Sequence, residues 1–379
     1  MPTHNAGMND ENSSLLPVPA GEGCLSVANQ VPPWPLKVVG AQVLAALSTL
    51  FNHFLFLARG VADALSLWVA HTYCVDEFSH SPRLAFCSAE PGSGKSAALD
   101  ILFTLSSRPV IMDCPSEASL CRLIHQVRPT LLLDETDNWL STSRGLTSLL
   151  NSGHRQGPAR ARCIGSKVRV YLTYGPVALA GLGDLPPTLQ TRALVVRMLP
   201  PKAGETREPF DILNCNPAKE LGRKLARWVM DNRMELRHCR PNLPANAVNR
   251  IADNWRPLFA IAEVAGGDWP ERARDGFEAL KSEASQGLSS GKMLLKCIQA
   301  IFAANGAHRI ASKVLVSELA KSDDLITNST RWTRPPTAQD VAQILRPYRI
   351  KPSTMRINGE LAKGYALADF ADAFERYLS

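Results

Sequence analysis

The chain has 379 residues, of which 45% are hydrophobic and 20% are charged, and its formal net charge is +7. This length can fill about two or three domains with cores of their own, which excludes a short peptide and a wholly disordered chain. The excess of Lys and Arg favours a polyanionic partner such as nucleic acid, although a basic cytoplasmic protein without such a partner would have the same balance.

Residues 1–38 are polar and rich in proline, which predicts a disordered tail without a signal peptide. Helices are expected within 39–80, over 39–58 and 60–75, because apolar residues recur there at helical spacing. The first of these is nearly long enough to span a membrane, but its polar residues favour a helix buried in protein. The nine cysteines have no paired spacing, so we expect reduced thiols in the cytoplasm and no structural zinc site.

Residues 81–200 alternate between apolar strands and helices, which predicts a parallel sheet with helices on both faces. The expected strands are 84–88, 109–112, 130–134, 168–173, 176–180 and 193–198, and the expected helices lie near 95–106, 116–127, 137–141 and 144–152.

The residues between the first strand and the first helix of this region are typical of a phosphate-binding loop. They read Ala89-Glu90-Pro91-Gly92-Ser93-Gly94-Lys95-Ser96. Backbone N–H groups of such a turn face a triphosphate, the lysine reaches its β and γ phosphates, and the serine hydroxyl binds Mg²⁺. The usual first glycine is replaced by Ala89, which the loop tolerates if Ala89 has a negative φ.

A second apolar strand further along the chain ends in two carboxylates, Asp134 and Glu135. Asp134 is expected to hold Mg²⁺ through water, and Glu135 is expected to polarise the attacking water. An acidic pair at a strand end is a weak signal alone, but here it follows the strand, loop and helix in the required order. The sequence therefore predicts hydrolysis of a nucleoside triphosphate, with ATP as the expected one.

Arg192 follows the strand 176–180, where ring ATPases place an arginine that faces the neighbouring subunit's γ-phosphate. The alternative is a surface arginine paired with a carboxylate. A polar sensor side chain is expected at the end of the same strand, but residues 180–183 supply none. Asp184, Tyr174 or a backbone group would then replace the sensor, or the sensor is missing.

Residues 205–288 are expected to form a helical lid after a linker, with helices over 217–232, 244–265 and 269–283. Arg250 and Arg256 are candidate contacts for nucleotide phosphate, and a salt bridge with Asp253 is the alternative. Residues 291–379 have the pattern of a winged helix, with helix caps at Ser312 and Thr337 and a hairpin turn at 358–359.

Two groups of basic residues are candidate DNA contacts. One lies on an expected hairpin that could line the pore of a ring, and the other lies in the C-terminal module. The first group is Arg155, Arg160, Arg162, Lys167 and Arg169, and the second is Arg331, Arg334, Arg346, Arg349, Lys351, Arg356 and Lys363. The alternatives are a solvated edge hairpin and a winged helix that docks a protein.

These motifs together resemble a bacterial P-loop family known as a domain of unknown function, which occurs in phage, plasmid and integrative-element proteins, often beside primase-type modules. The resemblance begins at about Ala64 and includes the P-loop, 129–135, 150–155, 176–183, 253–258 and 364–378. It implies a helicase-type ATPase that is distantly similar to minichromosome-maintenance helicases. By this likeness Arg192 falls where such rings place their arginine finger.

The sequence thus predicts an α/β protein with a P-loop AAA+-like parallel sheet, a helical lid and a C-terminal winged helix. We expect a DNA-dependent ATPase that uses ATP and Mg²⁺ and assembles as a hexameric ring. It would act as a replicative helicase or translocase of a mobile element, with a primase or another replication protein as a partner. The alternatives are a regulatory ATPase switch that acts through a protein partner as a loader, transposition regulator or defence component, and a P-loop protein that does not hydrolyse ATP.

Overall fold

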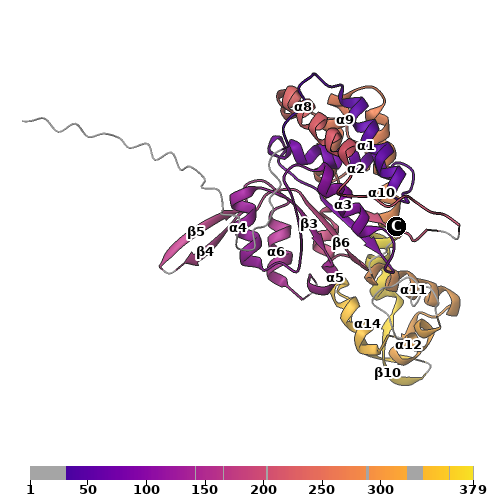
Figure 1. The fold of residues 1–379 in the computed structure, drawn as a ribbon. Coiled ribbons are helices and arrows are strands. Elements are labelled where there is room, and N and C mark those ends of the chain that lie inside the picture. Colours follow the sequence, from indigo (N-terminus) through magenta and orange to yellow (C-terminus); the bar gives the residue numbers. More distant parts are fainter. Residues whose placement is uncertain are drawn as a thin grey trace, which may run out of the picture.

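The computed structural model describes residues 31–140, 142–164, 166–201, 204–286, 290–321, 336–357 and 359–378. Its centre is a parallel sheet of five strands in the order β2-β3-β6-β1-β7, which confirms the α/β class (Figure 1). The strands are β1 (Arg83–Ser88), β2 (Pro109–Asp113), β3 (Thr130–Asp134), β6 (Val177–Leu182) and β7 (Ala193–Arg197).

Helices cover both faces of this sheet, and the side chains of each strand divide between them. In β1, Leu84 and Phe86 belong to one apolar core, whereas Ala85 and Cys87 belong to the other. The first face carries α1 (Gly40–Phe54), α2 (Val61–Tyr73), α3 (Lys95–Leu105), α8 (Asn216–His238), α9 (Arg250–Ala265) and α10 (Trp269–Gln286). The second carries α4 (Glu117–Val127), α5 (Thr136–Trp139) and α6 (Arg144–Ser152) (Figure 1). Because both faces are covered, the central strands are continuous apolar runs.

The segment expected as a separate lid shares one apolar core with the N-terminal helices. Trp269 of α10 donates from its indole Nε1 to the carbonyl of Ala41 in α1 at 3.0 Å. The Trp228 ring of α8 lies so close to Gly40 that a Cβ there would be 2.4 Å from it. Within the described residues, α8, α9 and α10 therefore pack as part of the sheet's first helical layer. None of the described helices is both long enough and apolar enough to cross a bilayer.

A two-stranded ribbon lies outside the sheet. Its strands are β4 (Ala159–Ile164) and β5 (Lys167–Leu172), which pair in antiparallel register and extend away from α4 (Figure 1). The expected hairpin is thus confirmed, whereas the expected strand 168–173 does not join the parallel sheet. Most of β5 is exposed, and a strand of a doubly covered sheet would be buried.

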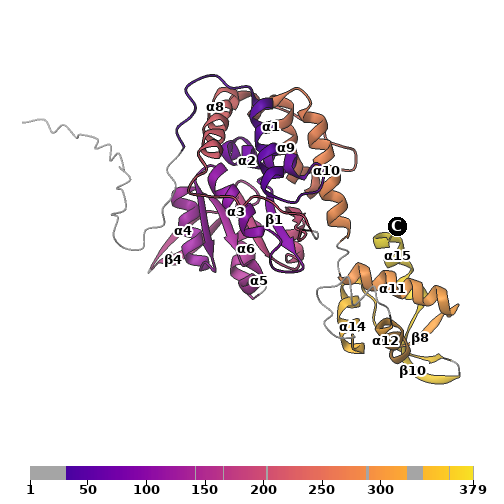
Figure 2. The ribbon, with the colours of Figure 1, turned by 45° about the vertical axis from the view of Figure 1, so that its right-hand side comes forward.

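The C-terminal residues form a second unit with its own apolar core (Figure 2). Its three-stranded antiparallel sheet has the order β8-β10-β9. The elements are α11 (Ser290–Asn305), β8 (Arg309–Ala311), α12 (Ser312–Ala320), α14 (Ala338–Leu345), β9 (Ser353–Ile357), β10 (Glu360–Ala366) and α15 (Ala371–Leu378). The sequence predicted all of these except β8, whose three residues are too few to show an alternating pattern.

The two expected helix caps of this unit have different outcomes. Thr337 accepts a hydrogen bond from the backbone N–H of Asp340, whose carboxylate in turn accepts from the Thr337 N–H. The cap predicted at Ser312 is wrong, because Ala311 is the N-cap residue and Ser312 is already helical. The expected DNA contacts Arg331 and Arg334 lie outside the described residues.

Arg83 is a buried cation that ties β1 to the end of α6 and to the chain before β6. Its guanidinium donates to the carbonyl of Leu150 at 2.8 Å and to the carbonyl of Gly175 at 2.5 Å. Burial lowers its pKa to about 9. The end of α6 must come very close to this group, since a Cβ on Gly153 would lie 2.1 Å from the Thr173 carbonyl oxygen and 2.8 Å from the Arg83 guanidinium.

We therefore expect Gly153→Ala to lower the free energy of unfolding by about 2–3 kcal/mol, because the new methyl group overlaps backbone that cannot move freely. Gly175→Ala is the matched control, since a Cβ there meets its nearest atom at 3.6 Å. Urea unfolding of both variants measures the difference. Equal stability of the two variants would contradict the packing described here.

Candidate nucleotide site

The 89–96 loop connects the carboxyl end of β1 to the first turn of α3. Two of its glycines adopt left-handed backbone, with φ of 77° at Gly92 and 87° at Gly94. Ala89 is not among the described residues with positive φ, so the condition under which this loop tolerates an alanine is met. The turn is therefore made by the two glycines that the sequence retains.

Lys95 begins α3 and its ammonium lies over the loop. It donates to the Ser88 hydroxyl at 2.5 Å and to the Ser93 hydroxyl at 3.4 Å, and the Ser88 hydroxyl donates to the Glu90 carbonyl at 2.7 Å. Ser96, the next residue, is exposed. The Lys95 ammonium and the exposed Ser96 hydroxyl thus lie at the amino terminus of α3, where the helix dipole also favours anions.

The two carboxylates at the end of β3 are held by the chain around them. Glu135 has a left-handed backbone with φ of 48°, which turns the chain sharply out of the strand. The Asp134 carboxylate accepts from the Glu135 N–H at 2.8 Å, and the Glu135 carboxylate accepts from the Asn138 side-chain amide at 3.0 Å. Burial, with a smaller contribution from the negative charge of Asp134, raises the pKa of Asp100 in α3.

One cleft of about 510 Å³ brings the loop and the carboxylates together. Only β6 separates β1 from β3, so the carboxyl ends of the two strands meet at the same edge of the sheet. Sequence reasoning missed two polar side chains of this cleft, Asp137 and Asn138. Asn138 could have been found in the sequence, because it follows Glu135 by one helical turn and side chains at that spacing can contact each other.

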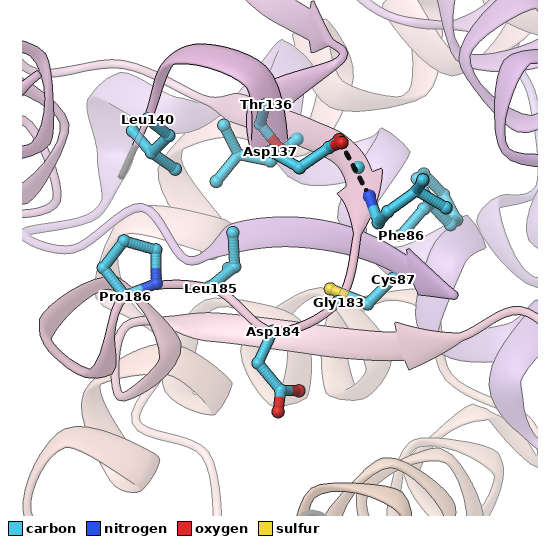
Figure 3. A pocket seen from close by; sticks show the side chains of 12 residues that line it. Phe86, Cys87, Thr136, Asp137, Leu140, Gly183, Asp184, Leu185 and Pro186 are labelled. Atoms are coloured by element: carbon cyan, nitrogen blue, oxygen red, sulfur yellow. Dashed lines mark hydrogen bonds between the residues drawn. The ribbon is translucent and has the colours of Figure 1, made fainter. Parts of the chain in front are cut away.

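The structure explains why β6 carries no polar side chain at its end. A Cβ on Gly181 would lie 2.4 Å from the Thr136 hydroxyl, so a larger residue has no room. The Asp137 carboxylate accepts from the Leu182 N–H at 2.9 Å and occupies this place, beside a hollow of about 130 Å³ (Figure 3). This arrangement fastens α5 to the end of β6.

Neither side chain considered as a substitute sensor reaches the cleft. Asp184 does not line the cleft at Lys95, and its carboxylate accepts from the Arg197 guanidinium at 2.7 Å. Tyr174 precedes β6 and donates to the Phe78 carbonyl at 2.6 Å, at the other edge of the sheet. Asp137 is the polar side chain that the structure places at the end of β6.

The donor atoms of the cleft suit Mg²⁺ carried by phosphates. Mg²⁺ binds oxygen, keeps several waters, and takes one or two protein ligands together with phosphate oxygens. The Ser96 hydroxyl and the Asp134 carboxylate face the same cleft and supply such ligands. No group of three or more His, Cys, Asp or Glu able to hold a metal occurs among the described residues.

Arg192 lies at the opposite edge of the sheet from the loop. It directly precedes β7, whose first residue pairs with Arg83 at the start of β1, and it follows α7 (Pro187–Gln190). Its guanidinium donates to the Thr188 carbonyl at 2.6 Å, and no carboxylate of the described residues pairs with it. Partial burial, with a smaller effect of the Arg250 charge, lowers its pKa.

The two arginines expected to bind phosphate from a lid lie at this same edge. Arg250 donates to the Thr191 hydroxyl at 2.7 Å, and Arg256 is exposed near His80. Neither lines the cleft at Lys95, because the amino-terminal half of α9 docks beside the start of β7. The alternative salt bridge with Asp253 is also not formed, since Asp253 lies 3.8 Å from His80 instead.

A buried hydrogen-bonded group holds α9 against this edge. Asn254 bonds His154 at 2.7 Å through its side-chain oxygen and donates to the Thr191 carbonyl at 3.3 Å. Burial, aided by the nearby charge of Arg83, lowers the pKa of His154 to about 3. Asn254, a residue of the 253–258 motif, therefore holds Thr191 in place, and Thr191 directly precedes Arg192.

The basic residues of the ribbon are only partly available to an anion. Arg160 and Arg162 both pair with Glu117 of α4. Lys167, Arg169 and Arg155 are exposed. The opposite face of the ribbon carries exposed apolar side chains, with Val168 at 66% and Val170 at 58% exposure. The expected positive face is thus neutralised in part near α4 and remains basic toward the turn.

The five described candidate DNA contacts of the C-terminal unit are exposed, and two of them share one face of the hairpin. Arg356 and Lys363 lie on the same side of the β9–β10 pair, because each opposes a residue of that face across the ladder. The other three, Arg346, Arg349 and Lys351, follow α14. The helix α14 itself contains no Lys or Arg.

Comparison with known proteins gives matches to parts of this chain. A family model with the description "Protein of unknown function (DUF3631)" matches residues 197–377, which is less than half of the chain. A protein of Saccharopolyspora erythraea, described as an uncharacterized 28.9 kDa protein in xis 5'region, is 32% identical over 161 residues. That match covers 41% of this chain and 59% of the relative, so the chain spans less than two thirds of the relative's length.

Two solved structures were also found to be similar. The match to the A form apo structure of the NrS-1 C terminal region covers 89% of this chain and 77% of the chain in that structure, at 11% identity and a TM-score of 0.40. A second structure of the same region gives 12% identity and a TM-score of 0.37, over 89% of this chain and 76% of that chain. Similarity at this level carries no argument about fold or function. The family model matches from residue 197 onward and supports the expected resemblance over that part of the chain.

The buried histidines predict a loss of stability in acid. The folded-state pKa values of His154 and His71, about 3, lie below the ordinary value of 6.5, so below pH 6.5 the unfolded chain binds more protons. As the pH falls below 6.5, the free energy of unfolding should decrease, and its slope should approach about 1.4 kcal/mol per pH unit for each histidine. Above pH 6.5 both states are neutral and the slope vanishes.

Urea unfolding between pH 7.5 and 5 measures this slope. His154→Gln keeps a hydrogen-bonding group for Asn254 but does not titrate. The slope of its free energy of unfolding against pH should therefore be smaller by the contribution of one histidine. An unchanged slope in His154→Gln would contradict the assignment.

Proposed function

We propose that this protein is an ATP hydrolase of the P-loop, AAA+-like class. The observation that carries the proposal is the single cleft that contains Lys95, Ser96, Asp134 and Glu135 at the carboxyl edge of a parallel sheet. The strand order β2-β3-β6-β1-β7 supports it, since the acidic strand is separated from the loop strand by one strand. Ligands of open α/β sheets bind at this edge of the strands.

The roles proposed for the residues follow from their positions. Backbone N–H groups of 92–96 and the Lys95 ammonium would bind the phosphates, and Ser96 and Asp134 would hold a Mg²⁺ ion that neutralises phosphate charge. Glu135 accepts a proton from the attacking water, and Asn138 holds its carboxylate toward the cleft. The Asp134 side chain fixes the strained Glu135 backbone in this orientation.

We further propose that Arg192 completes the cleft of a neighbouring subunit. It lies at the edge opposite its own loop and has no carboxylate partner among the described residues, so it is placed to meet a phosphate from outside. Such an arrangement requires an oligomer, for which a hexameric ring is the proposed form. A fixed cation at the γ-phosphate stabilises charge that develops in the transition state.

DNA is the proposed polymer on which this ATPase acts. We propose that it works as a ring-forming replicative helicase or translocase of a mobile element. A replication protein, such as a primase, would be its partner. The C-terminal unit supports contact with DNA, since its helices and its hairpin with Arg356 and Lys363 suit a winged helix. The exposed Lys167 and Arg169 of the ribbon would contact the phosphate backbone. The relative encoded in a xis 5' region supports the mobile-element context.

A regulatory ATPase switch that binds a protein partner is the second candidate. It is favoured by the ribbon, where Arg160 and Arg162 are already paired with Glu117 and the opposite face is apolar. An exposed apolar face suits a protein better than a phosphate backbone. This candidate predicts nucleotide-dependent binding of a protein and no unwinding.

Steady-state ATP hydrolysis with and without single-stranded and duplex DNA tests the two candidates. We expect DNA to stimulate turnover and added salt to weaken the stimulation. Glu135→Gln should lower turnover at least about 100-fold while ATP still binds, since a general base contributes roughly this factor. Lys95→Ala should abolish ATP binding, and Glu271→Gln, at an exposed carboxylate of α10 outside the cleft, should match the wild type.

The outcomes of this measurement separate the proposals. Turnover that DNA does not change supports the regulatory switch. Absence of ATP binding by the wild type contradicts both, and binding without turnover indicates a P-loop protein that does not hydrolyse ATP.

Mixing subunits tests the role of Arg192. We expect Arg192→Ala to lower turnover while ATP binding persists, because its guanidinium acts on a neighbour's nucleotide. Mixed with Lys95→Ala subunits, which keep Arg192, the variant should recover activity at interfaces that combine one intact cleft with one intact arginine. Arg240→Ala, an exposed arginine on the helical layer, is the control. Activity that falls in proportion to dilution, with no recovery, would argue that no site is shared.

A further inference from the structure

A second hollow adjoins the phosphate loop on the side away from the carboxylates. It has a volume of about 310 Å³ and shares Gly92, Ser93 and Gly94 with the cleft. Its walls come from the end of α1 and from the chain after β7, including Phe54, Phe56 and Met198. The proposed function assigns no role to this hollow.

The hollow is lined mainly by apolar and aromatic groups directly behind the loop. A Cβ on Gly94 would lie 3.6 Å from the Met198 methyl carbon and 4.0 Å from Leu55, so these two side chains border the loop backbone. Leu55 and Met198 are both about 2% exposed, whereas Phe54 and Phe56 are half-buried and line the open part. An apolar hollow beside a polar anion cradle suits a molecule that has an aromatic ring joined to phosphates.

The chain after β7 is fastened over the end of α1 by three contacts between side chains. The His53 ring and the Glu208 carboxylate lie 3.0 Å apart, the Arg207 guanidinium lies 4.7 Å from the centre of the Phe56 ring, and the Phe54 and Phe210 rings meet edge to face at 5.1 Å. These contacts hold the wall containing Thr206 and Arg207 next to the aromatic side chains. The hollow is therefore a preformed feature of the fold.

We propose that this hollow binds the base of a purine nucleoside triphosphate whose phosphates occupy the loop. The inference rests on the proposed nucleotide site and adds the part of the protein that recognises the nucleoside. The base contacts Phe54 and Phe56, which line the open part of the hollow, and the Arg207 guanidinium contributes a planar cation at the mouth. A purine gains more contact than a pyrimidine, because its two fused rings cover more of the apolar wall.

The test compares ligands that have the same phosphates and differ in the base. Calorimetric titration of Glu135→Gln protein, which does not consume ATP, is carried out with MgATP, MgCTP and magnesium tripolyphosphate. We expect ATP to bind more tightly than CTP, and CTP more tightly than tripolyphosphate. Phe56→Ala should weaken ATP binding about tenfold, the size of one base–aromatic contact, and leave tripolyphosphate binding unchanged.

A second variant guards against a folding defect in Phe56→Ala. Thr206→Trp, at an exposed position of the wall, fills the hollow without removing any core side chain and should weaken ATP binding to a similar extent. Trp34→Ala is the matched control, since it removes another half-buried aromatic ring under cationic side chains, Arg223 and Lys224, away from the hollow. It should bind all three ligands like the parent protein.

The possible failures are distinguishable. Tripolyphosphate that binds as tightly as ATP, or ATP binding that neither variant weakens, would overturn the base site and leave the P-loop proposal standing. Equal weakening of ATP and tripolyphosphate by both variants would place the effect at the phosphates and also overturn it. Binding of none of the three ligands by the parent protein would overturn the nucleotide site itself, and the base site with it.

Discussion

The parallel pairing of β6 with β1 on one side and with β3 on the other is the constraint on which the candidate site depends. Parallel strands end at the same edge of a sheet, and neighbouring strands are about 4.8 Å apart, so the ends of β1 and β3 are separated by about 10 Å. This separation leaves room for phosphates and a hydrated ion between Lys95 and Asp134. The sheet is buried on both faces, which keeps this spacing fixed while side chains in the cleft move.

Buried polar groups organise the opposite edge of the sheet. Arg83 donates to two carbonyl groups, and Asn254 links His154 to Thr191. Each of these groups is buried and would be costly to leave without a partner, so the loops and α9 are held in one arrangement. This arrangement holds the Arg192 and Arg250 side chains close together, at the edge of the sheet opposite the chain's own phosphate loop.

The helical layer over the first face joins segments that are far apart in the sequence. Helices α1 and α2 come before the sheet and α8 to α10 come after it, yet they share one apolar core. The hollow behind the loop arises at this junction, where the end of α1 meets the chain after β7. A change in the packing of α8 to α10 would therefore be felt at the phosphate loop, whereas the C-terminal unit has a core of its own.

The sequence by itself determined the features that depend on neighbouring residues. The glycines at 92 and 94, the acidic end of β3, the ribbon and the Thr337 cap follow from backbone preferences and from periodicity over short stretches, and the structure contains all four. Only the tertiary structure decided which distant groups meet. It placed Arg250 beside Thr191, paired Arg160 and Arg162 with Glu117, and brought Phe56 behind Gly94. These meetings depend on how apolar faces bury against one another across the whole chain, and no local pattern of residues records that choice.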